Sequence, residues 1–239
     1  CFDTAFHSSL PAAAYTYAIP SEFRNKGFRR FGFHGINHPH VSETVAAQWR
    51  EQGKDPSQLR LISAHLGAGA SLAAVRGGSC IDTTMGYTPL EGLVMATRSG
   101  SVDPGLLLEL MREGYSEDQM ATILQKESGL KGLSGLSGDM RTIREAAASG
   151  HNGAIRALDV FRHRLLQLLG SMAASLGGVD VLALTGGIGE HDKQLEQELA
   201  SALSWWGDFS TVVIPADEEG MIARLCQRHS EAPALAAVG

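Results

Sequence analysis

The chain has 239 residues, of which 44% are hydrophobic and 19% are charged, a composition that supports a folded core and argues against disorder. Its net charge of -6, without a cluster of Lys and Arg, argues against binding to nucleic acid or to an anionic membrane surface. No stretch approaches the roughly 18 apolar residues of a membrane span, and the N-terminus lacks the pattern of a signal peptide. Three widely spaced cysteines form neither a disulfide framework nor a CxxC metal site, which favours a cytoplasmic location. Because the chain begins with Cys1 and not with methionine, we expect it to belong to a longer polypeptide.

Short apolar runs alternate with amphipathic stretches, which is typical of an α/β fold. In chain order we expect a helix over 38–53, followed by a β-hairpin of strands 59–67 and 71–78. Three helices follow, over 104–113, from Ser116 to about 128, and over about 153–177. The last two strands are expected at 179–187 and 210–219. Asp103 with Pro104 predicts one helix start, and Ser116 with Gln119 predicts a capping box at the next. The long helix would carry one broad apolar stripe of Ile155, Leu158, Phe161, Leu165, Leu168, Leu169 and Met172.

Glycine clusters follow two of the expected strands. The stretch HLGAGAS (65–71) lets backbone N–H groups approach a ligand closely, as in phosphate-binding turns, although a hairpin turn needs glycine without any ligand. The stretch LTGGIGEHD (184–192) repeats this design, with a helix expected to begin near Asp192. It does not fit the dinucleotide fingerprint GxGxxG, because Asp192 stands where the third glycine belongs. This second stretch is therefore either a nucleotide loop of another kind or a tight strand-to-helix turn, and it lies at a strand end, where ligands bind in open α/β sheets.

Histidine and arginine mark two further loops. His34, His38 and His40 have spacings that helical metal ligands could use, but no carboxylate or cysteine nearby completes a zinc site. His34 stands between two glycines in FGFHG, a poor place for a core histidine, which favours a ligand-facing role. Arg98 is the one arginine in the mostly uncharged loop 88–105. It is either a surface residue or a guanidinium that stabilises negative charge, as in phosphoryl transfer.

Seven stretches, taken in order, resemble the successive signatures of the acetate kinases. They are FDTAFH (2–7), FGFHG (31–35), HLGAGAS (65–71), DTTMGYTPLEGLVMATRSG (82–100), GLSGLSGDMR (132–141), GGIGE (186–190) and IPADEEGMIAR (214–224). The resemblance runs from the first residues almost to the last, and TPLEGLVMATRSG is highly specific. The chain is therefore identified as a member of that family.

This resemblance implies a ribonuclease H-like α/β domain of the acetate and sugar kinase, heat-shock ATPase and actin superfamily, with a mixed sheet flanked by helices. In that family FDTAFH lies partway along the chain. Residues 1–219 would then form the second, C-terminal domain, and an N-terminal domain would be absent. Residues 220–239 would form a helical tail that packs on the absent domain. The resemblance also implies a homodimer that forms through the domain present here.

The implied reaction is the reversible, Mg2+-dependent transfer of the γ-phosphoryl group of ATP to acetate, which gives acetyl phosphate and ADP. Asp3 matches the catalytic aspartate that orients Mg2+, His34 and Arg98 match the residues that stabilise the transition state, and Glu218 matches a magnesium-associated carboxylate. The residues that match the nucleotide site are His65, Leu66, Gly67, Ala68 and Gly69 at the phosphates, Asp139, Met140 and Arg141 beside the adenosine, and Gly187, Ile188, Gly189, Glu190 and His191 at the adenine.

Three departures from the usual family pattern concern the nucleotide. Ala68 replaces an asparagine of the phosphate loop and removes an amide, His191 replaces a common asparagine, and Gly186 replaces an alanine. Two alternatives stay open: a propionate or butyrate kinase of the same family, and a non-catalytic, nucleotide-binding dimerisation fragment. The second is expected of this chain alone, because the absent domain would supply a further phosphate loop and the arginine that holds the substrate carboxylate.

Overall fold

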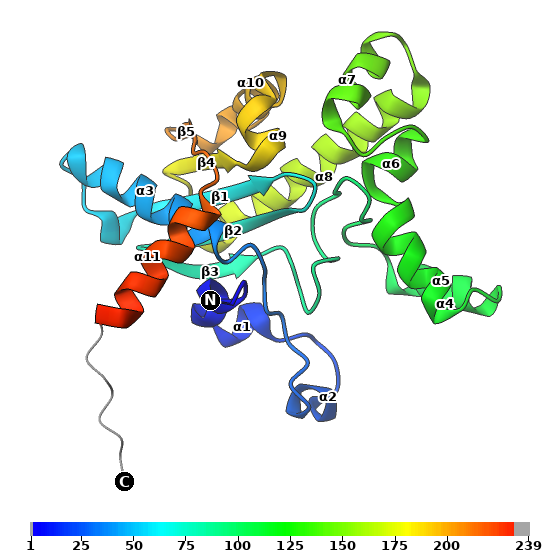
Figure 1. Cartoon of the computed structure of the whole chain (residues 1–239), viewed down its shortest axis with the longest axis horizontal. Helices are drawn as coiled ribbons and strands as arrows, with labels where there is room; N and C mark the ends of the chain where they lie inside the picture. The colour runs from blue at the N-terminus through cyan, green and yellow to red at the C-terminus, as the bar shows by residue number, and fades with distance from the viewer. Residues whose placement is uncertain (1, 232–239) are drawn as a thin grey trace.

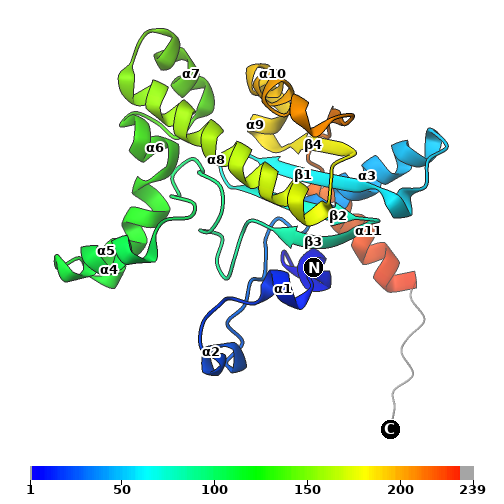
Figure 2. The same cartoon turned by 180° about the vertical axis from the view of Figure 1, so that it is seen from behind.

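The computed structural model describes residues 2–231, which are arranged around one five-stranded mixed sheet (Figures 1 and 2). The strand order is β3-β2-β1-β4-β5; β3, β2 and β1 run antiparallel, and β1, β4 and β5 run parallel. The strands are β1 Arg60–Leu66, β2 Ala70–Arg76, β3 Ser79–Thr83, β4 Val181–Thr185 and β5 Ser210–Val213. Because β1 and β4 are parallel neighbours, their carboxyl ends lie side by side, with His65 opposite Thr185.

The helices cover both faces of the sheet and form a lobe beside it. They are α1 Ala12–Tyr15, α2 Ser21–Asn25, α3 Asn37–Glu51, α4 Pro104–Arg112, α5 Glu117–Thr122, α6 Gly129–Ser134, α7 Met140–Ala148, α8 Asn152–Leu176, α9 Gly186–His191, α10 Lys193–Ala202 and α11 Glu218–Glu231. Both views show α4 to α7 standing apart from the sheet, at the far end of α8 (Figures 1 and 2). None of the described helices is both long and apolar enough to cross a lipid bilayer.

Two hydrophobic cores lie on opposite faces of the sheet. Successive side chains of a strand point to opposite faces, so β1 contributes Ile62 to one core and Leu61 to the other. The long helix α8 covers the first core and α3 covers the second. Burial on both faces explains why β4, with the sequence VLALT, is an almost continuous apolar run without alternation.

Most of the expected helices and strands are present close to their expected bounds. Asp103 caps α4, and Ser116 and Gln119 form both hydrogen bonds of the predicted capping box at α5. A single π-helical turn, Ile123–Glu127, continues α5 as far as the predicted end. The predicted hairpin is the β1–β2 pair.

The elements differ from the expectations at three places. The glycine cluster after β4 is helical and not a loop, because α9 begins at Gly186. The helix expected to begin near Asp192 is present as α10, which Asp192 caps. Strand β3 was not anticipated, since its sequence SCIDT is short and partly polar. Ile155 is 40% exposed and therefore does not belong to the buried stripe of α8, which contains Phe161, Leu165, Leu169 and Met172.

The helix α11 packs against α3. Met221 is buried at this contact, the Arg228 guanidinium pairs with the Glu43 carboxylate at 2.7 Å, and Arg224 donates to His40 Nδ1 at 2.9 Å. The described part of the expected tail thus has a partner within this chain, and its packing on a further domain stays a prediction. Residues 232–239 of the expected tail lie outside the described residues.

Candidate active site

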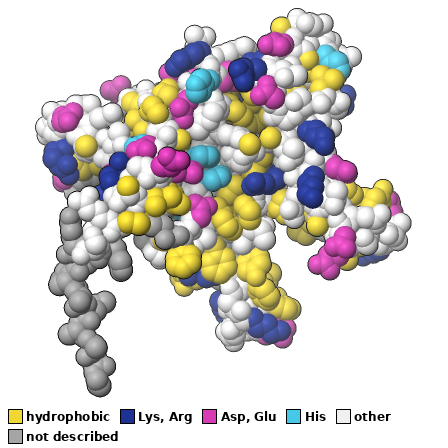
Figure 3. All heavy atoms as spheres, in the orientation of Figure 1, with side chains coloured by type: hydrophobic (Ala, Val, Ile, Leu, Met, Phe, Trp, Pro, Cys, Tyr) yellow, Lys and Arg dark blue, Asp and Glu magenta, His cyan; other side chains and the backbone are white. Residues whose placement is uncertain are grey.

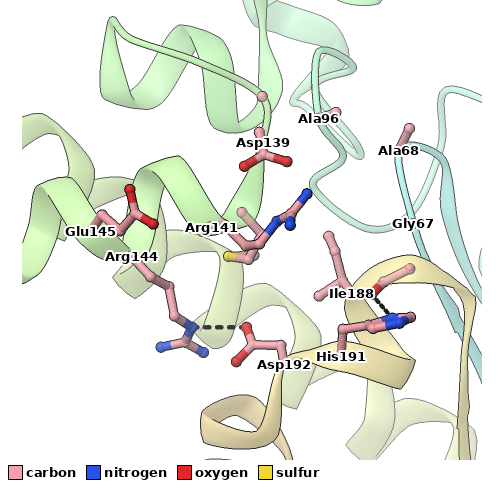
Figure 4. A pocket seen from close by; sticks show the side chains of 13 residues that line it. Gly67, Ala68, Ala96, Asp139, Arg141, Arg144, Glu145, Ile188, His191 and Asp192 are labelled. Carbon is pink, nitrogen blue, oxygen red and sulfur yellow. Dashed lines mark hydrogen bonds and ion pairs between the residues drawn. The ribbon is translucent and has the colours of Figure 1, made fainter.

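A pocket of about 880 Å³ opens between the strand ends and the helical lobe (Figure 4). Its walls come from the β1–β2 turn, the start of α7 and the helix α9, three segments far apart in the sequence. These are the segments in which the nucleotide site was predicted. The predicted residues that line the pocket are Gly67, Ala68, Asp139, Met140, Arg141, Gly187, Ile188 and His191.

The other predicted nucleotide residues lie beside the pocket and do not line it. Leu66 is fully buried in the sheet core, and Gly189 is buried close to the strand that precedes α9. Glu190 turns its carboxylate towards the protein, where Oε1 accepts hydrogen bonds of 3.0 Å from the backbone N–H groups of Gly186 and Ala216. The carboxylate thereby joins the chain segments that follow β4 and β5.

Glycine lets the β1–β2 turn and the start of α9 approach each other. Gly186 has a φ of 78°, and a Cβ at this position would lie 2.9 Å from the carbonyl oxygen of Leu66. The Gly67 N–H donates to the Gly69 carbonyl at 3.0 Å and closes the β1–β2 turn. A Cβ on Gly67 would lie 3.9 Å from the backbone nitrogen of Gly187. The backbones of the two turns therefore lie close together, and main-chain N–H groups in such turns are suited to phosphate contacts.

The start of α7 forms the facing wall. Asp139 is the N-cap residue, and its Oδ1 accepts hydrogen bonds from the backbone N–H and the hydroxyl of Thr142 at 3.0 and 3.1 Å. The hydrogen bond from the Thr142 backbone lowers the pKa of Asp139, and burial acts in the opposite direction. Arg141 is exposed and points into the pocket (Figure 4). The cap fixes where the helix begins and so where Arg141 stands.

Arg144 ties this wall to the α9–α10 side of the pocket. Its Nε donates to Asp192 Oδ2 at 2.8 Å and its Nη1 to Glu198 Oε1 at 3.1 Å. The Asp192 carboxylate also accepts the Leu195 N–H at the start of α10. Arg144 was missed by the sequence analysis, because its partners are 48 and 54 residues away in the sequence and no local signal marks them.

The first two predicted catalytic residues are held together by backbone contacts. The His34 N–H donates to Asp3 Oδ2 at 2.8 Å, and the Gly35 N–H donates to the Asp3 carbonyl at 2.8 Å. His34 has a φ of 55°, which is uncommon for a residue with a side chain. A Cβ on Gly35 would collide with the Asp3 carbonyl, so the glycine after His34 is needed for this close approach.

The third, Arg98, lies with His34 beside the β1–β2 turn. A Cβ on Gly69 would lie 3.2 Å from His34 Nε2 and 3.5 Å from Arg98 Nη1, so both side chains reach the same point of the turn. Arg98 is held by donation from Nη1 to the Pro89 carbonyl at 3.2 Å. Histidine and basic side chains are visible at the surface near the centre of this face of the molecule (Figure 3).

His34 and His65 are neutral at pH 7. Burial lowers the pKa of His34 to about 3, and repulsion from Arg98 and from the charge that His65 carries when it is protonated acts in the same direction. Burial also lowers the pKa of His65, whose ring stacks on that of His34 with centroids 4.1 Å apart. A neutral imidazole still carries one N–H and can donate one hydrogen bond to an anion.

The residues matched to Mg2+ supply carboxylate oxygens but not a complete coordination shell. Asp3 Oδ2 accepts the hydrogen bond from the His34 N–H, which leaves Oδ1 to coordinate a metal ion. Glu218 is exposed in the first turn of α11. Within residues 2–231, no three His, Cys, Asp or Glu side chains gather as a ligand set. Mg2+ is commonly held by one or two carboxylates together with substrate phosphates and water, so this small oxygen set fits the ion.

The comparisons with known proteins agree on one family. A sequence profile described as the acetokinase family matches residues 1–210. An acetate kinase from Acaryochloris marina is 53% identical over 206 residues, which are 86% of this chain and 50% of that protein. Crystal structures of an acetate kinase from Porphyromonas gingivalis and a propionate kinase from Francisella tularensis superpose with TM-scores of 0.90 and 0.86, at 38% and 36% identity. These two matches cover 95% and 93% of this chain and 62% of each of the others.

The structural matches establish the class of protein. The fold is that of the acetate and sugar kinase, heat-shock ATPase and actin superfamily, as the resemblance of the sequence implied. The order of the seven signature stretches is explained by the same finding. The chain belongs to the acetokinase family. It spans about half the length of the curated relatives it matches.

Proposed function

We propose that this chain carries the ATP-binding and phosphoryl-transfer residues of an acetate kinase, an enzyme of acetate metabolism that reversibly converts ATP and acetate to ADP and acetyl phosphate. The observation that carries the proposal is the meeting of the β1–β2 turn, the start of α7 and α9 at one pocket, with His34 and Arg98 beside Gly69 of the same β1–β2 turn. Membership of the acetokinase family supports the same activity.

The nucleotide occupies the pocket in this proposal. The adenosine lies between the start of α7 and α9, where Ile188 offers an apolar surface and Arg141 and His191 offer polar edges. The phosphates extend along the β1–β2 turn towards Gly69. This direction brings the γ-phosphoryl group to His34 and Arg98, which both approach Gly69.

The transfer needs positioning and charge stabilisation more than proton chemistry. Acetate is already ionised at neutral pH, so one of its oxygens attacks phosphorus without a general base. The new bond joins this oxygen to the γ-phosphorus, while the bond to the bridging oxygen breaks and ADP leaves with the electron pair. Arg98 stabilises the charge on the transferred group by charge-assisted hydrogen bonds, and His34 donates one neutral hydrogen bond. Mg2+, held by Asp3 and Glu218 together with the phosphates, would supply further positive charge.

Propionate is the second candidate acceptor. The support for it is the propionate kinase of Francisella tularensis, whose structure matches this chain almost as well as that of an acetate kinase does. Acetate stays the main proposal because the curated relatives at about 50% identity are acetate kinases. Rates with acetate, propionate and butyrate, compared as kcat/KM, decide between them.

We also infer that residues 1–219 form one domain of a two-domain, cytoplasmic homodimer, with 220–239 as a tail that packs on the other domain. The share of its relatives' length that this chain covers supports the further domain. Exposed apolar side chains on α4, namely Leu106, Leu108 and Met111, support a subunit interface. Light scattering on the purified chain gives its oligomeric state, and a monomer at all accessible concentrations would contradict an interface within this chain.

The deciding experiment compares this chain with the longest form that its gene encodes. Acetyl phosphate formed from ATP, Mg2+ and acetate is trapped as the hydroxamate, and ADP binding to each protein is measured by calorimetry. We expect turnover in the longer form, and ADP binding without turnover in the 239-residue chain. A folded longer form that binds ADP but makes no acetyl phosphate would contradict the acetate kinase proposal.

A further inference from the structure

A chain of hydrogen bonds runs from the interior of the domain to His34. His34 Nδ1 lies 2.8 Å from Ser71 Oγ, which lies 2.8 Å from His38 Nε2. On the other edge of the His38 ring, Nδ1 lies 2.8 Å from Ser63 Oγ. Ser63, His38 and Ser71 are all 0% exposed. We call these three hydrogen bonds the Ser63–His34 relay.

The fold brings these four residues together from two strands and a helix. Ser63 on β1 and Ser71 on β2 lie on the sheet face that packs against α3, because side chains two residues apart on a strand share a face. His38 lies in the first turn of α3 and contacts both hydroxyls. Ser63, His38 and Ser71 do not line the pocket and take no part in the proposed transfer.

The relay can be arranged in two directions, because each hydroxyl and each neutral ring carries one proton to donate. In the first direction Ser63 donates to His38 Nδ1, His38 Nε2–H donates to Ser71, and Ser71 donates to His34 Nδ1. Every proton within the relay is then used, and His34 carries its own proton on Nε2. In the second direction all three bonds reverse, and His34 carries its proton on Nδ1.

The surroundings of Ser63 select the first direction. Among the described residues, the Ser63 hydroxyl has one hydrogen-bond partner, which is His38 Nδ1. In the second direction His38 donates to Ser63, and the fully buried Ser63 O–H is left without an acceptor. A buried O–H without an acceptor is unfavourable, so the first direction is the more stable one.

We propose that Ser63, His38 and Ser71 are positioning residues that hold His34 in its Nε2–H form, so that it presents a fixed hydrogen-bond donor at the β1–β2 turn. The Nε2 atom is the one that reaches Gly69, beside Arg98. The nitrogen that carries the proton in a histidine is set by the hydrogen bond made at the other nitrogen, which here is the bond from Ser71. That the donor serves a transferred phosphoryl group rests on the proposed function, whereas the tautomer itself does not.

Nitrogen-15 spectra of the 239-residue chain, labelled at histidine, test the direction of the relay without any substrate. Long-range nitrogen–proton correlations distinguish the Nε2–H form from the Nδ1–H form, and His34→Gln and His38→Gln assign the two rings. We expect the Nε2–H form for both rings near neutral pH. An Nδ1–H form of either ring would overturn the proposal, whatever the activity of the protein turns out to be.

A second measurement tests the coupling, because free neutral histidine also favours the Nε2–H form. Ser63→Ala removes the first donor of the relay, three hydrogen bonds from His34, and should give His34 a measurable share of the Nδ1–H form. Ser63→Thr keeps the hydroxyl and should restore the original spectrum. Ser42→Ala is the matched control, since Ser42 is a buried serine, 4% exposed, that lies on the same helix as His38 and stands outside the relay.

A folded Ser63→Ala protein whose His34 signals match those of the unchanged chain would show that Ser63 does not set the tautomer. If Ser63→Ala does not fold, the spectrum of the unchanged chain and that of Ser63→Thr still decide the direction. In the active longer form, Ser63→Ala should lower kcat several-fold with little change in the KM for ATP, since no residue of the pocket is altered. Loss of turnover with an unchanged tautomer would contradict the inference.

Discussion

Arg98 and His34 reach the same turn but contribute different chemistry. Arginine side chains are permanent cations in proteins, whereas His34 is neutral because its pKa is lowered to about 3. We predict that Arg98→Ala lowers kcat about 10²–10³-fold, as loss of one transition-state donor does, with little change in the KM for ATP. Arg98→Lys should recover only part of the rate, because lysine keeps the charge and loses the planar fork. Steady-state rates of acetyl phosphate formation in the longer form measure both effects.

The control for this prediction is Arg162→Ala on α8. Arg162 is an exposed arginine that pairs with Asp159 on the same helix, so its removal should leave the kinetics unchanged. Equal rates for Arg98→Ala and the unchanged enzyme, with both proteins folded, would remove Arg98 from the proposed transition state.

Ala68 is the residue at which this chain departs most clearly from the family's phosphate loop. It is exposed on the pocket wall, and its carbonyl is held by the Ala96 N–H at 3.1 Å, so the backbone is already fixed. We predict that Ala68→Asn tightens ADP binding by about 10- to 150-fold, because a new hydrogen bond to a charged oxygen is worth about 1.5–3 kcal/mol. Calorimetry on the 239-residue chain measures the effect.

Ala68→Val is the matched control, because it adds volume at the same place without a donor. Tighter binding in both variants would assign the effect to packing and not to the amide. Unchanged binding in Ala68→Asn would mean that the amide does not reach a phosphate oxygen.

Single residues could be predicted from the sequence where they conflict with their local surroundings. His34 between two glycines and Arg98 in a nearly uncharged loop stand out for this reason. Arg144 and Ser63 could not be predicted, because an arginine on an amphipathic helix and a serine in an apolar strand are ordinary locally. Their partners, such as Asp192 and His38, are brought to them only by the fold.

At the scale of elements, signals that act within one turn were the most reliable. The capping box of Ser116 and Gln119 needs only three residues of separation, and both of its hydrogen bonds are present. The glycines of GGIGEH (186–191) predict a loop at the strand end, and glycine is a weak helix former. The segment is helical because Gly186 alone takes the positive φ at the end of β4, and Glu190 then binds back to the Gly186 N–H. Tertiary contacts therefore make α9 helical in spite of the low helix propensity of its glycines.

The packing of α11 on α3 gives an element-scale prediction. Met221 is 1% exposed at this contact, whereas its neighbour Ile222 is 38% exposed. We expect Met221→Ala to lower the free energy of unfolding by about 2–5 kcal/mol, the usual cost of truncating a fully buried side chain to alanine. Urea denaturation followed by circular dichroism measures the change.

Ile222→Ala is the control on the same helix and should cost far less, because its side chain is already partly in water. Equal effects of the two substitutions would show that α11 is not docked on α3 in solution. The expected order of the two effects therefore tests whether the helix keeps this partner in the isolated chain.

At the scale of the whole molecule, local patterns predict which segments form strands but not which strands are neighbours in the sheet. The order β3-β2-β1-β4-β5 places β4, about 115 residues further along the chain, beside β1. That single pairing brings the HLGAGAS and GGIGE stretches to one edge of the sheet and so creates the pocket. The resemblance to a family anticipated this meeting, whereas the periodicity of the sequence alone did not.

The same packing buries several histidines and makes the whole molecule sensitive to acid. Burial is the first cause that lowers the pKa of each of four histidines below the ordinary 6.5, namely His7, His34, His38 and His65. In the unfolded chain these groups take up protons below about pH 6.5, while in the folded chain they stay neutral to lower pH. The unfolded state therefore binds more protons in that range, and stability must fall as the pH falls. Each such group contributes a slope of up to about 1.4 kcal/mol per pH unit.

We therefore expect the free energy of unfolding to decrease steadily from about pH 7 to about pH 5, where most carboxylates are still ionised. Urea titrations across this range measure it. His38→Gln should make the slope shallower by the contribution of one group, because glutamine does not titrate, even if it lowers the stability at every pH. His163→Gln, at an exposed position on α8, is the control for the substitution itself. A stability that stays constant across the range would mean that these histidines are solvated, and the neutral hydrogen-bond donor assigned to His34 would then lose its physical basis.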